Sequence, residues 1–539
     1  MPILNWLTRD EDIHAAQRAP YRLLEEMSEL SAGDPNAGNM LIQGDNLEAL
    51  KALLPFYAGQ VKCVYIDPPY NTQSAFEHYD DNLEHTIWLR LMFARLENLR
   101  DLLSDDGSLF VQIDDNEGDY LKVVLDEVFG RKNFVSRITV KTRSPSAFST
   151  VNPGVFKSAE YILWYAKRRE KLDQNRVWVE READRAYDRF IENIDDDPSE
   201  WVISNIQEHV GLDLDRYSIK SQLAKLERFY VEQAPRIVRT ATISDSGAGA
   251  ATVSAKYESL RNPGKVIVQE RDGYDPIYII NGEQILFYSK NIHEIDGRHV
   301  PASMLTNIWT DVSWEGISAE GKVRFPKGKK PERLIKRIMD LATNKGDLVL
   351  DSFLGSGTTA AVAHKMERRY IGVEIGGHAK THCLPRLKKV IEGEQGGISK
   401  AVGWQGGGGF RFYRLGPPVF NEEGRLRDDI RFPVLAAHVW FSETDHPWDG
   451  VGDSPLLGIH DDRAYVLLYN GILGDKRPNG GNVLTRSTLA LIREEIGEIS
   501  PGFSGPLTVY GEQSRLALPT LERERITFKQ TPYDVKARA

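Results

Sequence analysis

The sequence predicts an α/β protein built on a largely parallel β-sheet. Residues 61–66, 107–114 and 347–351 form apolar runs with the length of buried strands, and the first of them is rich in β-branched side chains. Apolar residues at helical spacing follow the first run, and a small-residue helix is expected from Thr358 to Met366. Strands that alternate with helices are typical of a parallel sheet covered by helices.

The remaining elements of this sheet follow in chain order. A short apolar run at 40–42 precedes Gly44-Asp45-Asn46, which opens a helical pattern through Leu54. A long helix is expected near 88–103, where apolar side chains recur at intervals of three and four residues. Residues 370–374 read as a further strand that ends at Glu374.

Changes in composition and hydrophobic pattern along the chain predict five segments. Residues 1–38 form an N-terminal arm that ends in a Gly/Pro/Asn-rich loop, and 39–139 form the first half of the α/β domain. Residues 140–300 are irregular and are predicted to be an inserted domain, in which Asn281-Gly282 marks a hairpin turn. The alternating pattern of strands and helices resumes in 301–405, and a separate C-terminal domain, 406–539, is predicted to begin at the glycines 406–409.

Composition narrows the possible classes of protein. The chain has 539 residues, 41% hydrophobic and 27% charged, which is typical of a globular protein of several domains. Its two cysteines cannot form a disulfide framework, and no apolar run approaches a membrane span, so a cytoplasmic protein is expected. The formal charge of −10 argues against a globally basic nucleic-acid binder but allows a local basic face.

The first candidate site is the loop from Phe353 to Thr358. It follows a strand that ends at Asp351, contains Gly355 and Gly357, and leads into a helix. Glycines there let the backbone approach a ligand, and Glu374, at the end of the next strand, can bind ribose hydroxyls, so a nucleoside cofactor fits. The alternatives are a glycine turn needed only for packing, or a dinucleotide site, although its third glycine is replaced by alanine here. A phosphate-binding P-loop is excluded because no lysine follows Gly357.

The second candidate site is Asp67-Pro68-Pro69-Tyr70, directly after a predicted buried strand. Consecutive prolines stiffen the loop and remove two N–H donors, so the loop presents hydrogen-bond acceptors. A carboxylate with a proline carbonyl can hold an –NH₂ group, and a tyrosine ring can stack on a base. The alternative is a proline-stiffened turn in which Asp67 only caps a helix.

Together the two motifs resemble DNA adenine-N6 methyltransferases of the permuted β class, in which Asp-Pro-Pro-Tyr precedes Phe-x-Gly-x-Gly. The resemblance is strong over 40–135 and 320–390, and two C-terminal stretches (409–416 and 526–534) are similar to the modification (Mod) subunits of type III restriction systems. It implies a Rossmann-like, S-adenosylmethionine-dependent methyltransferase fold with its catalytic half in 39–139 and its cofactor half in 301–405. The inserted domain would recognise the target sequence.

The same resemblance assigns roles to individual residues. Asp67 and the carbonyl of Pro68, in the loop with Pro69, would bind the target amine, and Tyr70 would stack on the flipped base. The cofactor would be bound by residues of three strand ends and the glycine loop: Asp45 near its adenine, Asp351 near its amino group, Glu374 on its ribose, and Phe353, Gly355, Ser356, Gly357 and Thr358 along the loop. No metal site is predicted, because the histidines and cysteines show no ligand spacing.

Basic stretches are consistent with double-stranded DNA as the substrate. Residues 131–169 hold nine Lys or Arg and one acid, and residues 322–337 hold eight and one, with aromatic residues interleaved in the first stretch. A solvated charged face is the alternative for each run. The residues expected to contact DNA are Lys141, Arg143, Lys157, Lys327, Lys329 and Lys330.

The residues also bear on related activities and on partners. Cytosine-C5 methylation is excluded because neither cysteine follows a proline, whereas cytosine-N4 methylation, usual with serine in place of Asp67, stays open. A solitary methyltransferase and a non-catalytic DNA-recognition subunit stay open as well. The chain is expected to form a homodimer through 406–539, and any ATP-dependent restriction activity requires a separate subunit, since no ATP-binding loop is present.

Overall fold

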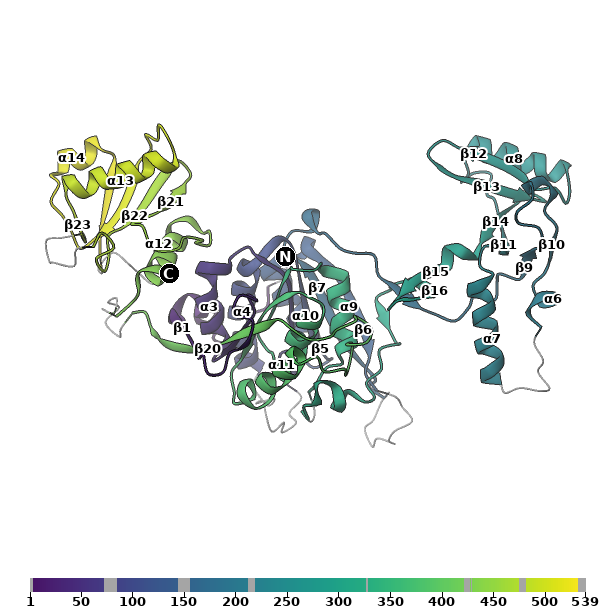
Figure 1. Cartoon of the computed structure of the whole chain (residues 1–539), viewed down its shortest axis with the longest axis horizontal. Helices are drawn as coiled ribbons and strands as arrows, with labels where there is room; N and C mark the ends of the chain where they lie inside the picture. The colour runs from purple at the N-terminus through teal and green to yellow at the C-terminus, as the bar shows by residue number, and fades with distance from the viewer. Residues whose placement is uncertain are drawn as a thin grey trace. The chain divides into compact units, whose positions relative to one another are not determined.

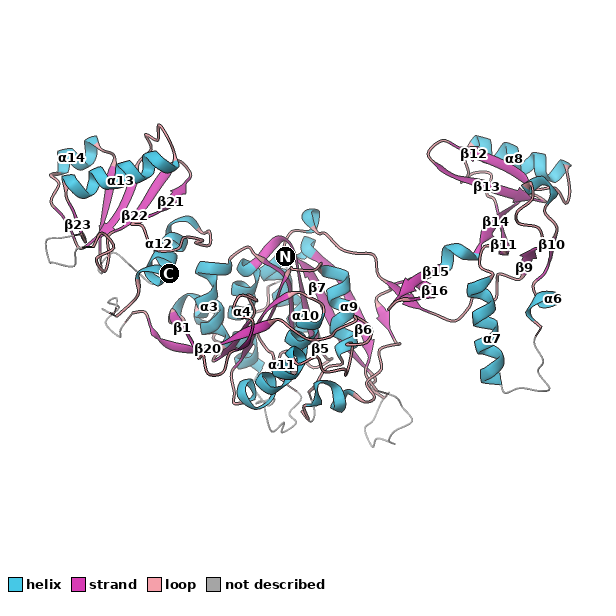
Figure 2. Ribbon diagram, in the orientation of Figure 1, coloured by secondary structure: helices cyan, strands magenta, loops and turns pink. Residues whose placement is uncertain are grey.

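The computed structural model describes residues 3–71, 85–143, 156–211, 219–325, 328–420, 427, 429–474 and 481–531. The chain divides into two compact units, one formed by Met1–Asn175 with Asn307–Ala539 and the other by Arg176–Thr306. Figure 1 labels many of the elements of both units, and Figure 2 distinguishes helices from strands. Each unit is described by itself below.

The first unit is built on one long mixed sheet. Its central strands lie in the order β20 (Gly409–Pro418), β3 (Met40–Gln43), β19 (Arg369–Glu374), β18 (Leu348–Asp351), β4 (Val61–Ile66), β5 (Leu103–Ile113), β7 (Ala159–Ala166) and β6 (Phe134–Lys141). Neighbours from β20 to β5 are parallel, whereas β7 runs antiparallel between β5 and β6. Short strands extend the edges: β1 (Arg22–Glu26) and β2 (Ala32–Gly33) pair with β20, and β17 (Ile308–Trp309) pairs with β6. The predicted Rossmann-like α/β fold is confirmed.

The strand order places the two sequence motifs side by side. Strand β18 pairs in parallel with β4, with Val349 opposite Cys63 and Leu350 opposite Val64. Asp351 and Asp67 therefore follow adjacent strands at the same edge of the sheet. From this point the chain builds the sheet outward in both directions, and in such sheets ligands bind in the crevice beyond the carboxyl ends at this position.

Two groups of helices pack against the sheet. One contains α3 (Asn46–Tyr57), α4 (His85–Leu102) and α5 (Gly118–Leu125), and the other contains α9 (Glu332–Ala342), α10 (Thr358–Lys365) and α11 (Leu384–Ile391). The short helices α1 (Arg9–Asp12) and α2 (Ala15–Arg18) contact α4. The apolar positions of the predicted long helix, Trp88, Met92, Leu96 and Leu99, are fully buried in the core. Each such side chain stabilises the fold by about 1.5–3 kcal/mol.

Three predicted boundaries differ from the structure. The separate unit begins at Arg176 and not near 140, because β6 and β7 pair with each other and with β5 in the main sheet. The predicted N-terminal arm supplies β1 and β2, and the predicted C-terminal domain supplies β20, which pairs with β3. The glycines at 406–409 therefore join two parts of one sheet. Gly33 and Gly409 are needed there, since a Cβ on Gly33 would lie 2.2 Å from the carbonyl oxygen of Gly408.

The second unit contains two antiparallel sheets. The larger has the order β10 (Ile203–Asn205), β9 (Arg189–Ile191), β11 (Ile237–Thr242), β14 (Glu283–Phe287), β13 (Tyr274–Ile280) and β12 (Ile267–Arg271), and the smaller has β15 (Ile292–Ile295), β16 (Arg298–Met304) and β8 (Trp178–Glu180). Helices α6 (Gln207–Val210), α7 (Ile219–Glu232) and α8 (Ala250–Arg261) accompany them. The hairpin predicted at Asn281-Gly282 is confirmed: both residues have positive φ, and they join β13 to β14.

The C-terminal part of the first unit forms a small α/β domain after helix α12 (Phe432–Thr444). Strands β21 (Leu456–His460), β22 (Arg463–Leu467), β24 (Leu507–Gly511) and β26 (Ile526–Gln530) form its sheet, with α13 (Arg486–Ile499) and α14 (Leu518–Arg523) as crossovers and a small pair, β23 (Val483–Leu484) with β25 (Gln513–Ser514). Helix α12 shares a buried cluster with Tyr21 and with Ala52 of α3. In the described part of the chain, none of the helices has the length and apolar character needed to cross a bilayer.

Candidate active site

The first half of the site is the loop that follows β4. All six residues of β4 are buried, so the strand fixes the position at which Asp67 leaves the sheet. Trp88 of α4 donates a hydrogen bond from Nε1 to the carbonyl oxygen of Pro69 at 2.8 Å, which orients the proline loop. The Asp67 side chain is 19% exposed, and its Oδ1 accepts from the Tyr70 hydroxyl at 2.7 Å.

Three further polar side chains surround Tyr70 and Asp67. The Tyr70 oxygen lies 2.9 Å from Glu160 Oε2 on β7, and Gln112 of β5 donates to the same carboxylate at 2.6 Å. Lys330, between β17 and α9, donates to the Tyr70 oxygen at 2.8 Å and lies 3.1 Å from Asp67 Oδ1 and 3.3 Å from Glu160. The Tyr70 hydroxyl is therefore part of a polar network, and the stacking of its ring on a base stays a prediction.

Burial and charge change the pKa values within this network. Burial raises the pKa of Asp67, the charge of Glu160 adds to this increase, and Lys330 opposes it. The pKa of Glu160 is lowered overall. Burial alone would raise it, but Lys330 and the hydrogen bonds from Gln112 and Tyr70 outweigh the effect of burial. For Lys330 the two carboxylates outweigh burial and raise its pKa, so it is a cation at neutral pH.

The second half of the site is the glycine loop between β18 and α10. Gly355 and Gly357 have φ of 56° and 78°, a conformation that glycine adopts without strain. The N–H of Leu354 donates to the carbonyl of Val373 on β19, which anchors the loop to the neighbouring strand. Gly357 is the N-cap of α10, so the loop leads directly into a helix N-terminus, as the sequence predicted.

Asp351 organises this loop from within. Its Oδ1 accepts from the N–H of Phe353 at 2.9 Å, and its Oδ2 accepts from the Thr359 hydroxyl at 2.6 Å. Because the carboxylate is buried, its pKa is raised to about 7. A cationic ligand group at this carboxylate would favour the ionised form, which is the chemistry expected for binding an amino group.

Glu374 and Asp45 lie at the next two strand ends. Glu374 Oε2 accepts from the N–H of Gly355 at 2.8 Å, so the acidic residue contacts the glycine loop directly. The N–H of Gly44 donates to the carbonyl of Glu374, which brings Asp45 to the same edge. Asp45 caps α3 through the N–H of Leu47 at 2.8 Å and forms an ion pair with Arg95 at 3.0 Å.

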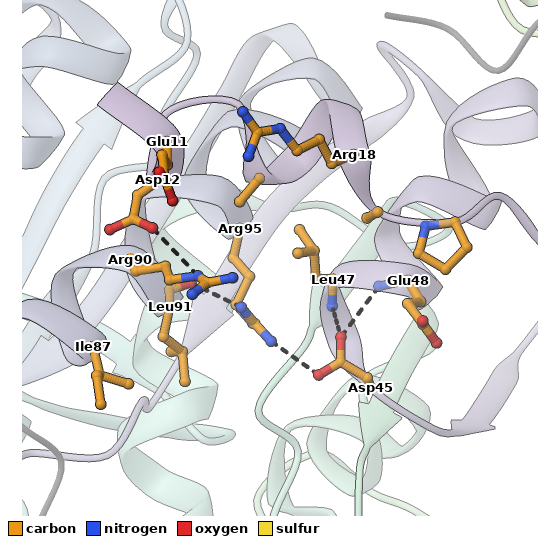
Figure 3. Close-up of a pocket in the computed structure, with 13 residues that line it drawn as sticks. Glu11, Asp12, Arg18, Asp45, Leu47, Glu48, Ile87, Arg90, Leu91 and Arg95 are labelled. Atoms are coloured by element: carbon orange, nitrogen blue, oxygen red, sulfur yellow. Dashed lines mark hydrogen bonds and ion pairs between the residues drawn. The ribbon is translucent and has the colours of Figure 1, made fainter. Parts of the chain in front are cut away.

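A cavity of about 460 Å³ adjoins Asp45. It is lined by residues of α1, α2 and the segment that follows them, the start of α3, and α4 (Glu11, Asp12, Ala15, Arg18, Ala19, Pro20, Asp45, Leu47, Glu48, Ile87, Arg90, Leu91 and Arg95). Figure 3 shows that the Asp45 carboxylate points toward Arg95, while its other oxygen accepts from the N-terminus of α3. The cavity therefore has a mixed charge lining at the end of β3.

The residues around the glycine loop fit S-adenosylmethionine. The carboxylates of Asp351, Glu374 and Asp45 follow neighbouring parallel strands, and they match a ligand with an ammonium group, ribose hydroxyls and an adenine amine. The buried Ser352 Oγ has no hydrogen-bond partner among the described residues, so a polar acceptor or donor at this strand end is left for another group. The residues thus match the hydrogen-bond donors and acceptors of this cofactor, at a loop in which Gly355 and Gly357 adopt positive φ.

A buried charge cluster supports the loop from behind. Arg386 of α11 is fully buried and donates to Thr358 Oγ1 at 2.8 Å and to the carbonyl of Ser356 at 3.3 Å. Its other nitrogen donates to Glu332 of α9 at 2.8 Å, and Glu332 also binds Lys365 of α10 at 2.9 Å. Arg386 therefore links the cofactor loop to the segment that carries Lys330.

Sequence reasoning did not identify several of these residues. Glu160 and Gln112 were weak signals: Glu160 is the single acid in a basic stretch, and Gln112 is polar within a buried strand. Glu332 gave the same weak signal, as the single acid in the basic run 322–337, whereas Arg386 had no local signal, because it is an ordinary charged residue on an amphipathic helix. Only the tertiary packing brings them to the two loops.

The predicted DNA-contacting residues fall into three groups. Lys141, Arg143 and Lys157 are exposed, and Lys157 lies 3.8 Å from Asp115. Lys327 lies outside the described residues. The prediction differs from the structure for Lys330, whose ammonium group is bound by Asp67 and Glu160, and for Lys329.

Lys329 is 3% exposed, and its Nζ donates to backbone carbonyls that include those of Ser318 and Val323. Its ammonium group stabilises the fold of the preceding segment and does not reach the surface. The basic run at 322–337 therefore does not form a single phosphate-binding face, since two of its lysines point inward.

The chain matches a known protein family over most of the catalytic sheet. Residues 61–383 match the family described as DNA methylase (N6_N4_Mtase), a range that begins with β4 and includes both loops. The chain belongs to this DNA methylase family. Its two family motifs are the loops that the parallel sheet brings together, as the resemblance implied.

Individual relatives agree with the family. The probable type III restriction-modification enzyme HindVI Mod subunit of Haemophilus influenzae is 37% identical over 75% of this chain and 58% of its own length. The type III restriction-modification enzyme EcoPI Mod subunit of Escherichia phage P1 is 28% identical over 68% of this chain and 61% of its own length. This DNA methylase thus spans about three fifths of the length of these relatives.

A solved structure also resembles part of this methylase. TTHA0409 of Thermus thermophilus, a putative DNA modification methylase, is 15% identical, with 65% of this chain and 93% of that chain covered and a TM-score of 0.31.

Proposed function

We propose that this DNA methylase transfers a methyl group from S-adenosylmethionine to N6 of adenine in double-stranded DNA. The observation that carries the proposal is the pair of adjacent strand ends, with the acceptor loop Asp67-Pro68-Pro69-Tyr70 after β4 and the glycine loop after β18. The adjacency supports the proposal because methyl transfer requires an amine-binding group beside a nucleoside-binding loop. The Mod relatives are subunits of type III restriction-modification enzymes, and we infer the same setting for this chain.

The reaction requires little covalent chemistry from the protein. When bound, S-adenosylmethionine supplies an electrophilic methyl group on its sulfonium. Asp67 and the carbonyl of Pro68 accept hydrogen bonds from the target amine and direct its lone pair outward, toward that methyl group. Pro68 and Pro69 keep these acceptors fixed, and the amine proton leaves after transfer. Reaching the amine requires the base to leave the duplex, which costs a few kcal/mol.

The test is a transfer assay with matched variants. Purified full chain is incubated with tritium-labelled S-adenosylmethionine and unmodified genomic DNA, and the digested nucleosides are separated by mass spectrometry. We expect N6-methyladenine from the unsubstituted chain and none from Asp67→Ala, with DNA binding retained. N4-methylcytosine as the product would support the second candidate activity, and an inactive chain that still binds a specific DNA sequence would support a recognition subunit.

We further propose that the unit Arg176–Thr306 recognises the target sequence and that the C-terminal domain serves assembly. The support is that Arg176–Thr306 folds as a unit of its own and that 419–539 carries no catalytic motif in its sequence. We infer a homodimer that can associate with an ATP-dependent restriction subunit in the cytoplasm, where its DNA substrate lies. Light scattering tests the dimer, and co-purification of an ATPase distinguishes this from a solitary methyltransferase.

A further inference from the structure

Lys330 and Glu160 contact the catalytic loop but come from distant parts of the chain. Lys330 precedes α9, Glu160 is on β7, and Asp67 follows β4. The Lys330 side chain is 10% exposed and that of Glu160 is 16% exposed, so water does little to screen their charges at Asp67. Neither residue is part of the two sequence motifs.

The Tyr70 hydroxyl has more hydrogen-bond acceptors around it than it has protons to donate. The Tyr70 hydroxyl has one proton, yet acceptor oxygens of two carboxylates lie within hydrogen-bond distance: Asp67 at 2.7 Å and Glu160 at 2.9 Å. Lys330 supplies further donors, with contacts of 3.1 and 3.3 Å to the same two oxygens, and Gln112 donates to Glu160 Oε2 at 2.6 Å. Two carboxylates with one cation carry a net negative charge, and in a buried site such a pair retains a proton more readily than isolated carboxylates do.

The protonation state of Asp67 determines whether it can act on an amine. An ionised carboxylate only accepts hydrogen bonds and can receive an N–H of the target base, whereas a protonated one presents a donor. A neighbouring cation favours the ionised form, and a neighbouring anion favours the protonated form. Lys330 and Glu160 therefore have opposite electrostatic effects on the same carboxylate.

We propose that Lys330 and Glu160 are positioning residues that act on Asp67 in opposite directions: Lys330 keeps it ionised, while Glu160 raises its proton affinity and holds Lys330 and Tyr70 in place. This inference rests on the proposed methyl transfer. The lowest pH at which the loop Asp67-Pro68-Pro69-Tyr70 is active then depends on two residues outside that motif. It also explains why a lysine of a basic run is directed inward.

Other titratable groups face this cluster and also contribute to the electrostatic potential at Asp67. Tyr65 and Tyr70 extend from β4 and its loop, Asp351 follows β18, and Asp114 follows β5 on the side of Glu160. Burial raises the pKa of both tyrosines well above the usual value, so they remain neutral donors at physiological pH. Asp351 contributes a further negative charge when it is ionised, and its effect is common to all the variants below.

The test is the pH dependence of kcat/KM for DNA methylation, measured with labelled S-adenosylmethionine and unmodified genomic DNA. The acid limb of this profile reports groups of the free enzyme. Lys330→Met removes the cation and should move the acid limb upward by about one pH unit or more, the smaller end of the effect of a close opposite charge. Glu160→Gln keeps the shape, removes the anion and should move the limb downward.

Two further variants make the result specific to charge. Lys330→Arg retains a cation and should restore the acid limb toward its original position. The double variant Lys330→Met/Glu160→Gln removes one charge of each sign, and its limb should lie between those of the single variants. If Lys330→Met is too unstable to purify, Glu160→Gln should still move the limb downward, and the limb of the double variant should lie above that of Glu160→Gln.

The outcomes separate this inference from the proposed function. Opposite shifts with a cofactor affinity within about twofold of the original support it, since a factor of two corresponds to well under 1 kcal/mol. A decrease in kcat/KM by the same factor at every pH, with the acid limb unmoved, would overturn this inference and leave methyl transfer intact. Acid limbs that shift in the same direction in the two single variants would do the same. An unsubstituted chain that methylates no DNA would overturn the proposed function, and this inference with it.

Discussion

Arg386 gives the sharpest test of how the cofactor loop is held. It is fully buried, with Nη1 bound to Thr358 Oγ1 at 2.8 Å and Nη2 bound to Glu332 at 2.8 Å. Lys365 and Glu394 complete the cluster, so two cations balance two anions without contact with water. Replacing Arg386 by methionine would retain most of the side-chain volume but remove one cation and the hydrogen bonds to the loop.

The expected loss follows from these contacts. Burial raises the pKa of Glu332, and Arg386 is the largest influence that lowers it, so its removal leaves an excess buried anion. Removing one partner of a buried ion pair costs about 3–5 kcal/mol, and Lys365 keeps the loss toward the lower end by remaining bound to Glu332. Because Ser356 and Thr358 lose their support, the Kd for S-adenosylmethionine should rise by about tenfold or more, equivalent to one hydrogen bond to a charged group.

The assay combines urea unfolding, followed by circular dichroism, with calorimetric titration of S-adenosylmethionine. Arg333→Met, an exposed position on α9, is the matched control and should change the unfolding free energy by less than about 0.5 kcal/mol. The double variant Arg386→Met/Glu332→Gln leaves Lys365 paired with Glu394, with no net charge. Its loss of unfolding free energy should therefore be smaller than the sum of the losses of the two single variants by about 0.5–3 kcal/mol. An Arg386→Met loss equal to that of the control, or an unchanged cofactor affinity, would refute the reasoning.

Three other perturbations test the two loops separately. Gly357→Ala should destabilise the fold by about 1–3 kcal/mol, because φ is +78° and a Cβ would lie 3.3 Å from Cys383 Cα; melting curves that match the original would contradict this. Cofactor affinity should fall up to tenfold per pH unit below pH about 7, since protonation of Asp351 removes its charge, and Asp351→Asn should abolish that dependence in titrations across pH. Trp88→Phe removes the hydrogen bond to Pro69, worth about 0.5–1.5 kcal/mol, and should lower kcat more than cofactor affinity; single-turnover rates equal to the original would exclude such a role.

The sequence was sufficient for the elements that depend on local pattern and strand order. Buried apolar runs predicted β4 and β18, and Asp67 and Asp351, at or just after their carboxyl ends, were candidate site residues. Parallel strands place their carboxyl ends together, so a shared site follows from the fold class alone. Gly355 and Gly357 were predictable for the same reason, since a close turn into a helix requires their conformational freedom.

Other features depend on contacts that local pattern does not encode. The glycines at 406–409 indicated a domain break, yet β20 pairs with β3 and extends the main sheet. The basic run at 322–337 indicated a phosphate surface, yet the ammonium groups of Lys329 and Lys330 bind backbone carbonyls and carboxylates inside the fold. Composition gives the charge of a side chain but not the direction in which it points.

The segment that carries Lys329, Lys330 and Glu332 connects these observations. Within four residues it supplies a cation to Asp67 and an anion to Arg386, which binds Thr358 of the glycine loop. Pro331 lies between Lys330 and Glu332, is the N-cap of α9, and has its own φ fixed by its ring. The loop Asp67-Pro68-Pro69-Tyr70 and the glycine loop are therefore tied to one short stretch of backbone as well as to the sheet. In the proposed methyl transfer, a displacement of this stretch would change the positions of substrate and cofactor together.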